Sequence, residues 1–129
     1  MSITYKVDAG HRRVTARAHG RLTEADILDY QNEVWSRPDV AGFDELVDMT
    51  DVVEIVSPSP DRFLHVATHA AAMDDRYSSS RFAIVATGDL HFGLGRMYSA
   101  YRNLSTTGTK QVSVFRSLEE AERWLLDQS

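Results

Sequence analysis

Three side chains that could bind a metal recur every four residues along one predicted helix, residues 60–73. Asp61, His65 and His69 would share a face of that helix, and imidazole nitrogens and carboxylate oxygens are zinc ligands. The zinc-protease motif places a Glu directly after the first His, whereas Val66 stands there in this chain. The alternative is a solvated polar face. We expect no metal, and we keep His65 and His69 as candidate contacts for a ligand or partner.

Two serines precede the same helix, in the string Ser57-Pro58-Ser59-Pro60. A phosphoryl group on either serine would lie near a helix N-terminus, where free amides and the helix dipole favour an anion. Serine is also a common N-cap, and proline suits the first helical position. Ser57 and Ser59 are therefore candidate contacts, as phosphorylation sites or as caps.

Five acidic residues with no base between them fall within residues 44–54: Asp44, Glu45, Asp48, Asp51 and Glu54. Asp48 comes near the end of a predicted parallel strand, residues 45–49, and ligands of open α/β sheets gather outside such ends. A carboxylate cluster could hold Mg²⁺, but this spacing matches no phosphate-handling loop. Asp48 is either a contact residue or a structural hydrogen-bond acceptor.

A buried strand, a glycine-marked turn and a helix follow one another in residues 81–104. The spacing of Gly88, Gly93 and Gly95 matches neither the P-loop nor the dinucleotide-binding fingerprint. Glycine inside a helix costs about 1 kcal/mol relative to alanine. Gly93 and Gly95 therefore indicate a close approach by another helix, a subunit or a ligand. Arg96, one turn on, could bind an anionic group or pair with a local acid.

The helix at residues 89–104 carries an apolar stripe, which we expect to face the core: Leu90, Leu94, Met97, Tyr101 and Leu104. Phe92, Tyr98 and Arg102 lie off that stripe. Phe92 would then face solvent, a second copy of the chain or a ligand. His91, Phe92, Met97 and Tyr98 complete the candidate contacts at this corner.

No arrangement of nucleophile and base is visible in the sequence. There is no cysteine and no Gly-x-Ser-x-Gly string, and the histidines have no Ser or Asp partner at a recognisable spacing. We therefore expect no catalytic residues, no cofactor and no enzymatic activity.

The elements that must position these residues follow from periodicity and caps. Residues 3–8 and 13–19 alternate and predict a hairpin. Thr23 and Asp26 form a capping box that opens a helix, and Ser117 with Glu120 opens the last one. Further strands are predicted at 45–49, 82–86 and 111–115. The order ββαβαβαβα predicts one α/β domain with a mixed, mostly parallel sheet of about five strands and four helices.

Bulk properties limit the kinds of partner. The chain has 129 residues and a net charge of -5, which argues against nucleic acid as a partner. No apolar run reaches the roughly 20 residues of a membrane span, and no signal sequence opens the chain. We expect a cytoplasmic protein, with peripheral membrane contact left open.

Several strings in this order resemble the SpoIIAA-like family, within the STAS-like group (sulphate transporter and anti-sigma factor antagonist domains). They are GRLT at 20–23, LVDM at 46–49, FAIV at 82–85, FGLGRM at 92–97, VFR at 114–116 and EEAERWL at 119–125. The resemblance implies a small non-catalytic module. Anti-sigma antagonists bind a kinase-like partner and are switched by a serine in a D-S-S/T-G motif, whereas residues 56–61 here read VSPSPD.

The resemblance leads to three hypotheses. The first is a regulatory module that contacts a protein partner or a second copy of itself through residues 57–69. The second follows from an outline similarity to the lipid-binding CRAL-TRIO fold. It places an apolar or amphipathic small molecule between the sheet and the helices at 60–73 and 89–104, against Phe92, Met97 and Tyr98. The third is an enzyme of unknown reaction.

Overall fold

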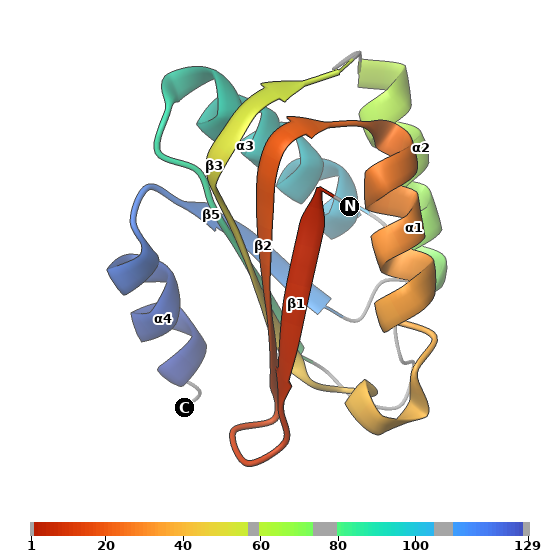
Figure 1. Cartoon of the computed structure of the whole chain (residues 1–129), viewed down its shortest axis with the longest axis vertical. Helices are drawn as coiled ribbons and strands as arrows, with labels where there is room; N and C mark the ends of the chain where they lie inside the picture. Colours follow the sequence, from red (N-terminus) through yellow and green to blue (C-terminus); the bar gives the residue numbers. More distant parts are fainter. Residues whose placement is uncertain (1, 57–59, 74–79, 105–109, 128–129) are drawn as a thin grey trace.

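The computed structural model describes residues 2–56, 60–73, 80–104 and 110–127. They form a single five-stranded sheet and four α-helices in the predicted order (Figure 1). The elements are β1 (Ile3–Asp8), β2 (Arg13–Leu22), α1 (Glu24–Val34), the 3₁₀ turn η1 (Pro38–Val40), β3 (Asp44–Ile55), α2 (Pro60–Ala72), β4 (Ser80–Val85), α3 (Asp89–Leu104), β5 (Lys110–Phe115) and α4 (Leu118–Leu126). No helix in the described ranges is long and apolar enough to cross a membrane.

Each successive strand is added to the same edge of the sheet. Its strand order is β1-β2-β3-β4-β5, with β1 antiparallel to β2 and every later pair parallel. Right-handed crossovers that all step the same way place their helices on one face. The main core accordingly joins the sheet to α1, α2 and α3, whereas α4 packs on the opposite face (Figure 1). Because the strand order never reverses, the sheet has no switch-point crevice at its strand ends.

The caps predicted from the sequence are present at α1 and α4. The Thr23 hydroxyl accepts from the Asp26 amide at 3.0 Å, and the Asp26 carboxylate accepts from the Thr23 amide at 3.1 Å. The Ser117 hydroxyl accepts from the Glu120 amide at 3.2 Å. Each bond satisfies an amide that the first helical turn leaves without a partner.

Strand β3 is longer than predicted. Residues 50–55 were expected in a connection, yet they continue β3 beside β2, where Leu22 is in register with Ile55. Ion pairs between Arg21 and Glu54, and between Arg17 and Asp51, join the polar sides of the two strands. The pairing of β3 with β4 ends at Asp48, which therefore lies in the middle of β3 rather than near its end.

The core-facing side of α3 also differs from the predicted stripe. Gly95, Tyr98 and Arg102 are buried, whereas Leu90 is 69% exposed. Gly95 accounts for this orientation, because a Cβ there would lie 2.9 Å from Val114 Cγ2 on β5. A close approach at Gly95 is therefore present, but the neighbour is the sheet and not the helix, subunit or ligand that we expected. A Cβ on Gly88 or Gly93 would meet nothing within 4 Å.

A matched pair of substitutions tests this packing. Gly95→Ala forces Val114 or the helix to move, which costs about 1–3 kcal/mol, while Gly93→Ala at an open position gains up to about 1 kcal/mol of helix propensity. Both variants gain helix propensity because both glycines lie within α3, so we expect Gly95→Ala to be the less stable variant by the steric cost alone, about 1–3 kcal/mol in urea unfolding. Equal stabilities would contradict the close contact of α3 with β5.

Candidate functional site: an apolar cavity walled by a buried polar cluster

A cavity of about 80 Å³ lies between the sheet and helices α1, α2 and α3. Its lining is almost wholly apolar and comes from strands β1 to β4 and helices α1 to α3, with Trp35 at the end of α1. The lining residues are Ile3, Ala18, Leu22, Ile27, Tyr30, Gln31, Trp35, Val47, Met49, Ile55, Val66, Phe82, Ile84, His91, Gly95 and Tyr98. Among them, Ile27, Trp35, Met49, Ile55 and His91 are half-buried, and the other lining residues are buried.

One wall of the cavity belongs to a row of aromatic rings. Tyr5, Tyr30, Trp35, Phe82 and Tyr98 follow one another edge to face, with centroids 5.9–6.4 Å apart. The row crosses the core from β1 through the α1 region to β4 and α3. Edge-to-face pairs contribute about 0.5–1.5 kcal/mol each beyond their buried area, so the row stiffens this wall.

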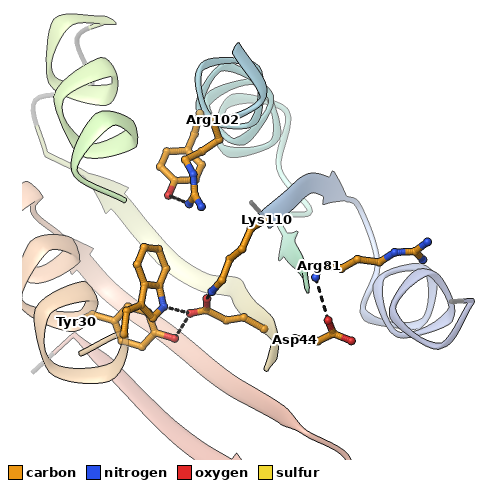
Figure 2. A network of polar contacts seen from close by, with 8 residues as sticks. Tyr30, Asp44, Arg81, Arg102 and Lys110 are labelled. Carbon is orange, nitrogen blue, oxygen red and sulfur yellow. Dashed lines mark hydrogen bonds and ion pairs between the residues drawn. The ribbon is translucent and has the colours of Figure 1, made fainter. Parts of the chain in front are cut away.

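A buried carboxylate holds two of these rings in place. Glu45 on β3 is 1% exposed and accepts hydrogen bonds from the Tyr30 hydroxyl and, at 3.0 Å, from Trp35 Nε1. Lys110 at the start of β5 reaches the same carboxylate, with Nζ 3.0 Å from Oε1 (Figure 2). A buried charge is tolerated only when it is paired and hydrogen-bonded, and Glu45 has both kinds of partner.

Two cations stand beside Trp35. Lys110 Nζ lies 4.5 Å from the centre of the Trp35 ring, and Arg102 Cζ lies 5.5 Å from the same centre. Arg102 on α3 is 2% exposed, and its Nη1 donates to the Tyr98 hydroxyl at 2.9 Å (Figure 2). Neither cation lines the apolar cavity. A second cavity of about 50 Å³ reaches Glu45 and Lys110, and Trp35 lines both cavities.

The polar cluster also affects a titration. Burial, the charge of Glu45 and the hydrogen bond to Glu45 together raise the pKa of Tyr30 well above its usual value of 10.0. Burial is the largest of these causes, and it acts by disfavouring the charged phenolate. Tyr30 therefore acts as a permanent hydrogen-bond donor to Glu45.

Of the residues singled out in the sequence, three line the cavity: His91, Gly95 and Tyr98. Phe92, Gly93, Arg96 and Met97 do not. Phe92 instead lies under the Arg116 guanidinium, whose Cζ is 4.2 Å from the ring centre. The cavity is thus lined by the face of α3 that carries His91, Gly95 and Tyr98, and the contacts expected for Phe92 and Met97 are not made there.

The remaining candidates lie away from the cavity. Asp48 Oδ1 accepts from the Thr50 amide at 2.9 Å, which is the structural role considered for it. His65 is exposed on α2, and His69 Nε2 lies 3.0 Å from Asn32 Oδ1 on α1. Ser57 and Ser59 fall outside the described residues. Over the described ranges, no three His, Asp or Glu side chains come together as a metal site would require.

Sequence reasoning missed Gln31, Glu45, Arg102 and Lys110. The two-residue period of a strand could have identified Glu45, because Glu45 shares the core side of β3 with Val47 and Met49. The helical period could have identified Arg102, because it lies seven residues after Gly95 and four after Tyr98, on the same face of the helix. The general rarity of fully buried charges argues against both residues as core positions.

A double-mutant cycle tests the buried ion pair. Glu45→Gln and Lys110→Met should each cost about 3 kcal/mol, because each leaves a buried group without its partner. The double variant should lose about 2 kcal/mol less than the sum. Glu119→Gln with Arg123→Met, an exposed pair on α4, serves as the control and should show almost no coupling. Additive losses in the buried pair would contradict the contact.

The Tyr30 pKa predicts a pH dependence. In the unfolded chain Tyr30 ionises near pH 10, whereas its raised pKa in the folded chain keeps it protonated. Its stabilising contribution is therefore complete below about pH 10 and falls as the pH rises above that value. Urea unfolding between pH 9 and 11 should show a steeper loss of stability in the parent protein than in Tyr30→Phe. Identical slopes in the two proteins would contradict a raised pKa of Tyr30 in the folded chain.

Comparison with known proteins gives the fold. No protein-family model matches the chain, and no curated protein matches it. Among solved structures, the chain is similar to an uncharacterised protein of the DUF3478 family from Shewanella loihica PV-4, described as having a SpoIIAA-like fold. The match has a TM-score of 0.60 and 16% identity, over 96% of this chain and 94% of that one. At this identity the likeness concerns the fold alone, and the chain therefore has the SpoIIAA-like α/β fold that its strings predicted.

Proposed function

We propose that this chain is a non-catalytic binding module that takes a small apolar or amphipathic molecule in the cavity between the sheet and helices α1 to α3. The observation that carries the proposal is the lining of that cavity, which is almost wholly apolar and lies within a well-packed core. Ligand sites are typically concave and apolar with a few placed polar groups.

The chemistry of the lining supports binding rather than catalysis. The hydroxyls and the indole of the aromatic wall are engaged in bonds within the protein: Tyr30 and Trp35 with Glu45, and Tyr98 with Arg102. Of the groups that an enzyme could use, His91 lines the cavity, whereas Asp48, His65 and Arg96 do not. A catalytic site needs several reactive groups that converge on one point.

Protein–protein regulation remains the second candidate. Leu64 on α2 is 50% exposed beside the exposed His65, and an apolar residue on the surface can take part in a partner contact. These residues belong to the 57–69 surface, whose first three positions lie outside the described residues. The contact with a partner or with a second copy stays a prediction.

Binding can be tested with a small linear alcohol. 1-Hexanol should bind, and calorimetry with methyl NMR should place it by shifts at Ile27, Val47 and Ile55. Ala18→Ile fills the cavity floor and should abolish binding without unfolding the protein. Thr15→Ile, on the opposite face of β2, is the matched control and should bind normally. Binding that survives Ala18→Ile, or no binding to the parent protein, would refute the proposed site.

A further inference from the structure

The outward face of α3 is apolar, although the exposed face of a surface helix normally carries charged and polar residues. Leu90, Gly93 and Ala100 are exposed on this face, and Leu90 keeps 69% of its surface accessible. Met97 beside them is half-buried. We propose that these four residues, the seam, form the interface of a symmetric homodimer, in which the α3 helices of two copies pack antiparallel about a two-fold axis at Gly93. The inference is independent of ligand binding in the cavity.

The seam has the spacing by which helices pair. Steps of three, four and three residues separate its members and keep them on one side of the helix. The seam cannot turn into the core, because Gly95 holds the opposite side of α3 against β5. Burial of the seam therefore requires a second helix from outside the chain.

Gly93 has no role in the packing of a single chain. A Cβ at this position would meet no atom within 4 Å, so the fold does not need a glycine there. Glycine inside a helix is less favourable than alanine, and it is used where another backbone approaches closely. On the two-fold axis Gly93 would lie against its own counterpart, and Leu90 would then lie opposite Met97 of the second copy.

The charges beside the seam select an antiparallel second copy. Asp89 and Arg96 are seven residues apart, so they lie on the same flank of α3. An antiparallel helix is turned end over end, so this flank meets the same flank of the second copy, and Asp89 of each chain lies beside Arg96 of the other. In a parallel pair it would meet the flank of Leu94 and Tyr101, which carries no charge. The face is thus complementary to itself, as a two-fold interface must be.

Both charges are available for these pairs. Arg96 is exposed and has no hydrogen bond or ion pair within the residues that the structure describes. The Asp89 side chain is 94% exposed, and Arg116 Nη1 lies 2.6 Å from its Oδ1, which leaves the other carboxylate oxygen for a second cation. Charge pairs across an interface fix its orientation more than they add affinity, so the apolar seam supplies the association.

The size of the face indicates a weak dimer. A stable interface buries about 1,600 Å² in total, and contacts below about 1,200 Å² are typical of transient complexes. One face of a helix of 16 residues belongs to the second class. We therefore expect monomers and dimers to exchange, with dimers forming at micromolar concentrations.

Two leucines of similar exposure test the face. Leu90→Gln removes an apolar side chain from the seam, and Leu126→Gln changes a leucine on α4 that is 73% exposed. Both side chains are exposed, so both variants should fold like the parent protein. In sedimentation velocity, Leu90→Gln should weaken self-association about tenfold, whereas Leu126→Gln should leave it unchanged. A parent protein that stays monomeric up to about 1 mM, or equal effects of the two substitutions, would overturn the inference.

An exchange of charges tests the orientation. Arg96→Glu and Asp89→Lys each bring like charges together in a homodimer, so each variant alone should associate about tenfold more weakly than the parent protein. In an equal mixture of the two variants, both pairs across the interface are again of opposite charge. The mixture should therefore form heterodimers about as readily as the parent protein forms homodimers. A parent protein that dimerises, with no recovery in the mixture, would overturn the antiparallel arrangement about Gly93.

Discussion

The structure depends on one buried carboxylate. Glu45 gathers the Tyr30 hydroxyl, the Trp35 indole and the Lys110 ammonium at a point with almost no access to water. These contacts tie the α1 region to β3 and to β5, although β4 lies between the two strands. Desolvating the charges is costly, so the cluster is favourable only when it is complete. Because Tyr30 and Trp35 are also walls of the cavity, the same carboxylate fixes the shape of the candidate binding site.

The aromatic row borders both a polar cluster and an apolar cavity. Lys110 and Arg102 lie against Trp35 but do not line the cavity, whose lining is mostly aliphatic and aromatic. Cation–π contacts and edge-to-face pairs both depend on ring orientation, so they limit how far the rings can turn. The protein can therefore keep two cations close to an apolar cavity without placing their charge inside it.

The winding of the sheet explains why the cavity lies between layers. Three crossovers that step in one direction bring α1, α2 and α3 over a single face, and α4 covers part of the other. Arg81 anchors α4, since its side chain donates to the Trp124 carbonyl and stacks on the Trp124 ring (Figure 2 shows Arg81 beside Asp44). A sheet of this kind offers no crevice at a reversal of strand order, although Asp48 was expected near a ligand site outside the end of its strand.

The sequence by itself determined the order of the elements, the hairpin, the caps at Thr23 and Ser117, and the close approach at Gly95. These features depend on periodicity and on contacts between neighbours in the chain. The tertiary structure decided the length of β3, the core face of α3 and the burial of Glu45 and Arg102. The partners of Glu45 are 10, 15 and 65 residues away in the chain, and no local pattern encodes such distances. A charged side chain is expected at the surface until folding brings its partners together, and only then does burial become favourable.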